Sequence, residues 1–198
     1  MAQEVDDDHC KDYDPYGTRT PLPALDLLTD EEAINALQNI LQMAKSGQVE
    51  AKLEAAKIFC DLTLHDSMQQ LMCDSGCVQS LVVDLMRCDT CEWTSHHAIF
   101  ALANLSEAQC CQDTIIDAGA LPALLAIAKD GPYDKAERSR EAARILANIS
   151  ERVATRVVTI LGPRTVSNWL DSIETFVDER LKLHAIRARD SLAIVFAN

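Results

Sequence analysis

The stretch FALANLSE, residues 100–107, returns as RILANISE, residues 144–151. Each copy places an asparagine, Asn104 or Asn148, among apolar residues. An asparagine amide competes for backbone hydrogen bonds and therefore disfavours a helix interior. Finding it twice in matching places indicates a repeated unit in which the asparagine has a purpose.

A leucine-like residue and a glycine recur with one shared period of 43 or 44 residues. These positions are Leu62, Leu105 and Ile149, and Gly76, Gly119 and Gly162. Ahead of Leu105, Ala98 and Leu102 complete the i, i+4, i+7 spacing of a helix. Gly76 and Gly119 fit sharp helix–helix corners that need a positive φ. A period of this length predicts an all-α solenoid.

The segment AIFALANLSEAQCCQDTIIDAGALPALLAIAKDG, residues 98–131, closely resembles the armadillo repeat. Residues 137–171 match it fairly well and residues 51–87 more weakly, and the resemblance extends over about 30–198. It implies an all-α, right-handed α-α superhelix of the armadillo solenoid type, with about three full repeats and partial terminal ones. We expect this helical repeat domain over residues 27–198.

The two ends of the chain differ from the central repeats. Residues 1–26 are acidic and rich in proline, and we expect a disordered tail. Residues 33–47 resemble the last helices of an incomplete first unit, and Thr29, Asp30 and Glu32 predict a capping cluster at its start. Residues 181–198 read as the long helix of a fourth repeat, whose apolar end either folds back or pairs with another chain.

One helix face gathers the candidate binding residues. Asn104 is rotated by about 100° from the buried Leu105, and it shares a face with residues one and two turns earlier. The candidate partner-binding residues on this face of the three units are Lys57, Asp61, His97, Phe100, Asn104, Arg140, Arg144 and Asn148. The resemblance implies that this face lines a concave groove, where the asparagines bind the backbone of an extended partner. Alternatively, both asparagines bond adjacent helices and only fix the stack.

The side chains beside the asparagines indicate what kind of partner is bound. Strong groove binders of the armadillo family carry tryptophan four residues before each asparagine, but this chain has Lys57, Phe100 and Arg144 there. Recognition of basic localisation signals is therefore disfavoured. The cations Lys57, Arg140 and Arg144 indicate an extended or helical partner segment with acidic side chains. Glu107 and Glu151 either rim the groove or are solvated helix ends.

Composition and charge exclude several classes. The chain has 198 residues, of which 48% are hydrophobic and 25% charged, so it is expected to fold. A net charge of -13 disfavours nucleic acid as a partner. No apolar run approaches the length of a membrane span, and the start lacks a secretory signal, so we expect a cytoplasmic or nuclear protein.

Cysteines and histidines give weak signals for chemistry. The spacing of Cys73, Cys77, Cys88 and Cys91 is compatible with zinc, but the repeat alignment places Cys73 and Cys77 in the core. His96 and His97 lack the accompanying motif of a nucleophilic site. We therefore expect no catalytic residue, no metal and no cofactor, and the chain is not expected to be an enzyme.

The sequence thus predicts an intracellular adaptor or scaffold that binds another protein in the groove of an armadillo solenoid. Two alternatives remain open. One is a chaperone co-factor of the nucleotide-exchange type. The other is a self-associating structural protein, a homo-oligomer joined through its C-terminal helix.

Overall fold

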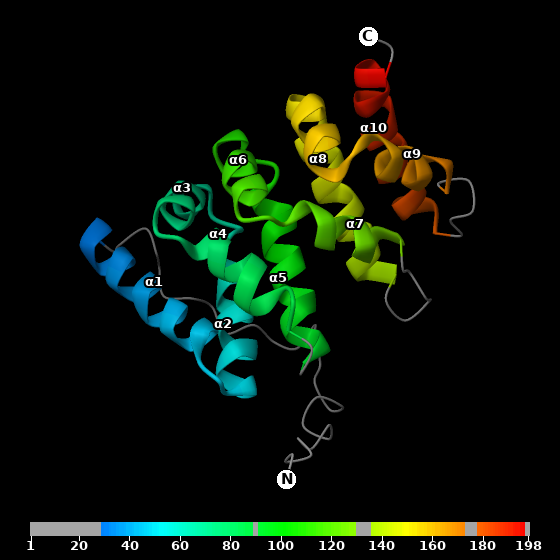
Figure 1. The fold of residues 1–198 in the computed structure, drawn as a ribbon. Coiled ribbons are helices and arrows are strands. Elements are labelled where there is room, and N and C mark those ends of the chain that lie inside the picture. Colours follow the sequence, from blue (N-terminus) through cyan, green and yellow to red (C-terminus); the bar gives the residue numbers. More distant parts are fainter. Residues whose placement is uncertain (1–28, 89–90, 130–135, 173–177, 197–198) are drawn as a thin grey trace. The chain divides into compact units, whose positions relative to one another are not determined.

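Every regular element in the described residues is a helix, as the sequence predicts (Figure 1). The computed structural model describes residues 29–88, 91–129, 136–172 and 178–196. The proposed acidic tail, residues 1–26, lies outside them. The chain divides into two units, residues 1–98 and 99–198, which are described separately below.

Unit 1 contains the first four α-helices, one π-helical turn and the start of α5. Its elements are α1 (Asp30–Lys45), α2 (Val49–Leu62), α3 (Asp66–Asp74), α4 (Cys77–Ser80), η3 (Leu81–Leu85) and the first half of α5 (Glu92–Leu105). Helix α1 packs against α2, α4 and η3. Large side chains such as Phe59, Met72 and Leu81 are fully buried between these helices.

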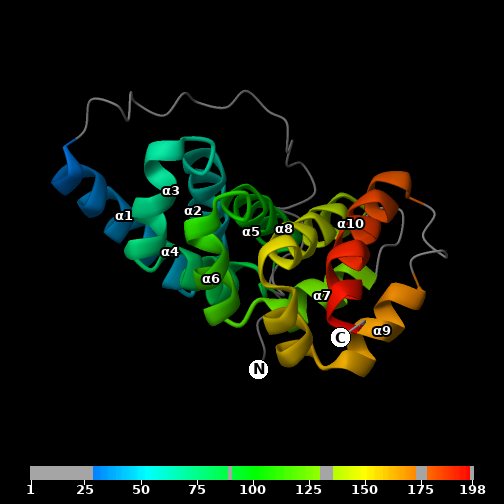
Figure 2. The ribbon, with the colours of Figure 1, turned by 90° about the horizontal axis from the view of Figure 1, so that it is seen from above.

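Unit 2 contains the end of α5 and the remaining helices. These are α6 (Gln109–Asp117), α7 (Leu121–Lys129), α8 (Ala136–Leu161), α9 (Pro163–Asp171) and α10 (Glu179–Phe196). Helix α8 packs against α7 and along α10, and Figure 2 shows α8 and α10 side by side. Small residues such as Ala142, Ala185 and Ala188 are completely buried, and their size lets helices approach closely.

The predicted capping cluster at the start of α1 is present as a capping box. The Thr29 hydroxyl accepts a hydrogen bond from the Glu32 backbone N–H at 3.3 Å, and the Glu32 carboxylate accepts one from the Thr29 backbone N–H at 2.8 Å. These bonds satisfy donors that a helix start leaves unpaired. They also lower the pKa of the Glu32 carboxyl.

The three periodic glycines all have a positive φ, which the sequence predicts for Gly76 and Gly119. Gly76, Gly119 and Gly162 have φ of 80°, 77° and 82°, and no non-glycine residue in the described part of the chain has a positive φ. Each stands immediately before or within the turn that leads into the next helix. Pro163 follows Gly162 at the first position of α9, where its missing N–H costs no hydrogen bond.

The third sequence repeat departs from the predicted pattern. The sequence suggests a helix end at Ile149 followed by a short connection, as at Leu62 and Leu105, but α8 continues to Leu161. The interruption lies at Val153, whose φ of -130° and ψ of 41° are not helical. Glu151 and Arg152, directly before Val153, and Ala154, directly after it, are compatible with a helix, which explains why the break is confined to one residue.

No single helix in the described part of the chain is both long and apolar enough to cross a membrane. Helices α6 and α7, bent by 94°, pass that test only as a pair, by length and composition.

Candidate functional site: a polar groove in unit 2

A polar groove of about 530 Å³ lies in unit 2. Its walls come from the turn after α5, the start of α6, the middle of α8 and α10. The lining residues are Ser106, Glu107, Gln109, Gln112, Arg144, Asn148, Glu151, Arg152 and Arg187. We call this set the unit 2 groove. Three of its lining side chains are arginines and two are glutamates, on a chain that is acidic as a whole.

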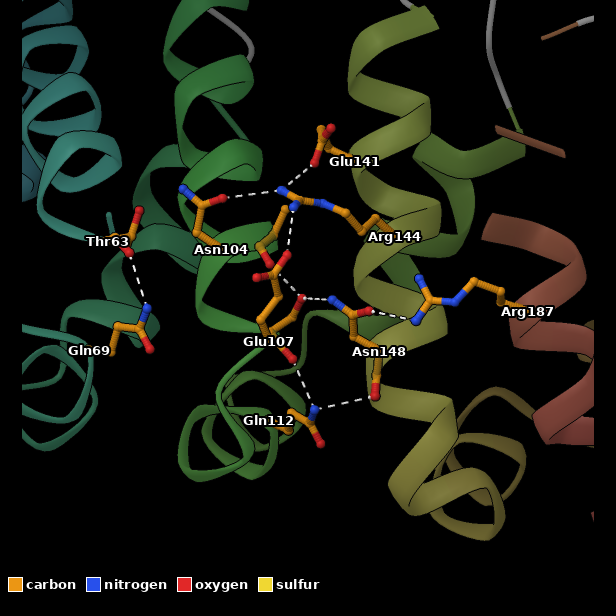
Figure 3. A network of polar contacts seen from close by, with 11 residues as sticks. Thr63, Gln69, Asn104, Glu107, Gln112, Glu141, Arg144, Asn148 and Arg187 are labelled. Carbon is orange, nitrogen blue, oxygen red and sulfur yellow. Dashed lines mark hydrogen bonds and ion pairs between the residues drawn. The ribbon is translucent and has the colours of Figure 1, made fainter. Parts of the chain in front are cut away.

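Arg144 on α8 connects two successive repeats. One terminal nitrogen of its guanidinium donates to Glu107 at 2.8 Å, and the other donates to the Asn104 carboxamide oxygen at 3.2 Å (Figure 3). Glu141, one turn earlier on α8, pairs with the same guanidinium at 2.6 Å. Arg144 is therefore held in one orientation by three groups.

Arg187 on α10 makes the same arrangement one sequence repeat later. It donates to Glu151 at 2.5 Å and to the Asn148 carboxamide oxygen at 3.3 Å (Figure 3). Each arginine thus contacts the asparagine and the glutamate of the preceding unit. This shared contact accounts for the asparagine and the glutamate that the two quoted stretches have in common. We call each such arrangement an arginine latch.

Asn148 has a second, buried contact. Its carboxamide donates to the Ser106 hydroxyl at 2.9 Å, and only 9% of the residue is exposed. The Gln112 amide donates to the Ser106 carbonyl at 2.9 Å and to the Asn148 carbonyl at 3.3 Å. Because these groups are buried, leaving one unpaired would cost stability. Both asparagines therefore contribute to the contact between successive helices.

The glutamine contact also occurs in unit 1. Gln69 donates to the Thr63 carbonyl at 3.2 Å, at the same sequence separation as Gln112 from Ser106 (Figure 3). In both units the bond satisfies a carbonyl just after the end of a helix, where the backbone leaves acceptors unpaired. Neither glutamine was predicted from the sequence, although each stands seven residues after a matching leucine, Leu62 or Leu105.

Acidic residues of α6 meet the second half of α8. Arg152 donates to Gln112 at 2.8 Å and to Asp113 at 2.5 Å, and Arg156 donates to Asp113 at 2.8 Å. Arg156 also pairs with Asp117. The hydrogen bond from Arg152 lowers the pKa of the Asp113 carboxyl, and the charges of both arginines add to this effect.

Burial and the charges of the latch arginines both change the pKa values of titratable groups beside the latches. Burial lowers the pKa of the His184 imidazole, and the positive charges of Arg187 and Arg144 lower it further. Burial raises the pKa of the Glu141 carboxyl, and the charge of Arg144 opposes that rise. Burial is therefore the larger cause of both pKa shifts, and the charges of the arginines act on the groups next to them.

The structure brings together only some of the predicted binding residues. Asn104, Arg144 and Asn148 meet in the latches of unit 2. Arg140 pairs with Asp178 at 2.9 Å and does not line the groove, and Phe100 is half-buried on α5 outside the lining.

The other three candidates belong to unit 1. Lys57 lies 3.8 Å from Glu54, Asp61 is half-buried on α2, and His97 is buried edge-to-face against His96 with 7% exposed. Their contact with a partner stays a prediction. Conversely, Arg187 was not predicted from the sequence. Arg189 stands where Leu102 and Leu146 predict an apolar residue, which left the repeat register of 181–198 undecided.

The cysteines expected in the core, Cys73 and Cys77, are buried. Burial raises the pKa of the Cys77 thiol to about 12, which makes it a poor nucleophile and metal ligand. In the described part of the chain no group of three or more His, Cys, Asp or Glu side chains is arranged to hold a metal ion.

No protein-family model and no curated protein match the chain. Solved structures do. A computationally designed armadillo repeat protein for modular peptide recognition is 20% identical with a TM-score of 0.70, over 80% of this chain and 65% of that one. An engineered protein is 25% identical with a TM-score of 0.68, over 84% and 68%.

A third similar structure is a designed armadillo repeat protein in complex with the peptide (KR)4. It is 20% identical with a TM-score of 0.68, over 82% of this chain and 67% of that one. The chain thus spans about two thirds of the length of these three structures. The likeness confirms the predicted all-α, armadillo-like repeat fold.

Proposed function

Because this chain has an armadillo-like repeat fold, we propose that it is a protein-binding scaffold whose unit 2 groove holds an acidic segment of a partner. The observation that carries the proposal is the pair of arginine latches. In each latch, an asparagine accepts a hydrogen bond from the guanidinium, and a surface glutamate forms an ion pair with it. A repeat scaffold is also the reason to expect binding in place of catalysis.

The glutamate of each latch is suited to being replaced. Glu107 is 62% exposed and Glu151 is 50% exposed at their side chains. Ion pairs at such positions contribute only about 0–1 kcal/mol, because water screens them. A carboxylate from a partner can therefore take the place of either glutamate at little cost.

The arginines, by contrast, stay in place when the glutamate leaves. Asn104 and Glu141 continue to hold Arg144, and Asn148 continues to hold Arg187. A planar guanidinium held in advance can bind a carboxylate with two parallel hydrogen bonds and loses little conformational entropy in doing so. We assign the asparagines this positioning role; a direct contact with the partner backbone stays a prediction.

Similar proteins support a peptide partner, and the groove supports its charge. One similar structure holds a peptide of lysine and arginine. The unit 2 groove presents arginines, so a basic peptide would be repelled here and an acidic one attracted.

The test is the binding of a short fluorescein-labelled peptide of alternating aspartate and glutamate, measured by fluorescence anisotropy. We expect Glu151→Gln to tighten binding by about fivefold, because it removes the internal competitor for Arg187 (~1 kcal/mol). Arg187→Ala is expected to weaken binding by at least as much. An (Lys-Arg) peptide of equal length should bind less tightly than the acidic one.

The matched control is Arg180→Ala, which removes an exposed arginine of α10 outside the groove lining and should leave binding unchanged. Thermal unfolding of each variant checks that the fold is intact. Unchanged or weaker binding by Glu151→Gln, or tighter binding of the basic peptide, contradicts the proposal.

A further inference from the structure

A second cavity of about 360 Å³ adjoins the unit 2 groove. It lies between the second half of α8 and the end of α10. The lining residues are Ser150, Glu151, Arg152, Val153, Ala154, Thr155, Arg156, Ser191, Ile194 and Val195. We call it the terminal cavity. Glu151 and Arg152 line both spaces, so the two are continuous neighbours within unit 2.

The terminal cavity is the groove repeated one unit later. Ser106 and Glu107 of the groove correspond to Ser150 and Glu151, which end the second copy of the quoted stretch. On the facing helix, Asn148 corresponds to Ser191, because Arg144 and Arg187 stand four residues before them and make the same latch. The repeat relation therefore aligns the two spaces position by position.

That alignment shows where the two spaces differ. The groove has Glu151 and Arg152 on α8, three and four residues after Asn148. The terminal cavity has Ile194 and Val195 at the corresponding places on α10. Ile194 is 65% exposed, so an apolar side chain faces solvent where the groove has a charged pair.

The rest of the terminal cavity keeps the charge of the groove. Arg152 and Arg156 line it beside one glutamate. Both are already paired with exposed carboxylates of α6, Asp113 and Asp117, which a carboxylate of the partner would have to replace. Its occupant therefore needs both an apolar side chain for Ile194 and Val195 and a negative charge compatible with the arginines. An acidic segment already lying in the adjoining groove supplies both if it carries one apolar residue.

We infer that the terminal cavity is an apolar subsite for the same acidic partner segment. It binds one large aliphatic side chain of that segment. This inference rests on the proposed function. Packed helices are about 8–10 Å apart and an extended chain advances about 3.3 Å per residue, so the aliphatic residue stands about three positions from the carboxylate at the latches.

The test compares two labelled acidic peptides that carry either leucine or alanine at one position, moved along the peptide in a series. In one register the leucine peptide should bind about tenfold more tightly than its alanine twin. Ile194→Asn should remove that difference while leaving the affinity of the alanine peptide unchanged.

The matched control is Leu183→Asn, which changes another exposed aliphatic residue of α10, 58% exposed and outside both linings. It should preserve the tenfold difference. If leucine gives no advantage in any register, or if Ile194→Asn keeps the advantage, the subsite is refuted although the acidic peptides still bind. If no acidic peptide binds at all, the proposed function itself fails.

Discussion

Arg144 and Arg187 show how a single residue type sets the relation between successive repeats. Each contacts the asparagine and the glutamate of the unit before it, at nearly the same sequence separation. The next contact, from Asn148 to the Ser106 hydroxyl, has no counterpart one unit later. Ser191 stands where that asparagine would be, and the Ser150 hydroxyl is buried without a hydrogen-bond partner.

We therefore expect Ser191→Asn to stabilise the protein. The new carboxamide would donate to the Ser150 hydroxyl, as Asn148 does to Ser106, and a net hydrogen bond contributes about 1 kcal/mol. For a chain of this length that corresponds to a rise of ~2–4 °C in the thermal midpoint. Thermal unfolding followed by circular dichroism measures it.

The control is the same substitution in a Ser150→Ala background, which lacks the acceptor. The gain should vanish there. An equal rise of the thermal midpoint in both backgrounds would show that the added side chain acts by packing alone. No rise in either background would show that the two successive repeats do not share the register inferred from the latches.

At the scale of elements, the glycine corners decide where one helix ends and the next begins. A Cβ built on Gly76 or Gly119 meets no atom within 4 Å, so the requirement for glycine there is one of backbone conformation and not of space. A residue with a Cβ is strained at such a φ by about 1–2 kcal/mol.

Gly119→Ala is accordingly expected to lower the free energy of unfolding by about 1–2 kcal/mol. The comparison is Gly47→Ala, because Gly47 also has nothing within 4 Å of the added Cβ but lacks the positive φ. Its effect should stay within about 0.5 kcal/mol. Urea denaturation of both variants distinguishes them, and equal effects would mean that the corner tolerates alanine.

At the scale of the whole molecule, a net negative charge stands beside a groove that is lined by arginines. The chain carries a net charge of -13, while the groove presents arginines. Salt screens the distant charges first, since the Debye length falls from about 30 Å at 0.01 M to about 8 Å at 0.15 M. The overall charge should therefore affect mainly the association rate constant, and the latches should affect mainly the dissociation rate constant.

This predicts an unusual dependence on salt. Raising the salt concentration from 0.01 M to 0.15 M should increase the association rate constant of the acidic peptide, because long-range repulsion is screened. The dissociation rate constant should increase as well, because the ion pairs in the groove weaken. Stopped-flow anisotropy gives both rates, and an association that slows with salt would contradict this division of roles.

Much of the fold followed from short-range rules that the sequence states directly. The spacing of Ala98, Leu102 and Leu105 predicted a helix, the periodic glycines predicted the corners, and Thr29 with Glu32 predicted the cap. Each depends on residues within one or two turns, so no distant contact had to be known. The sequence by itself therefore determined the helices, their period and the repeat fold.

Which side chains meet across repeats was decided only by the tertiary structure. Arg187, Gln112 and Ser106 contact residues 36 to 42 positions away, and a shift of one residue in helix register would separate them. Helix α8 extends past Ile149, and α10 packs along it, which the repeat pattern did not predict. Periodicity shows that faces repeat, but the contacts across them depend on how closely buried alanines let the helices approach.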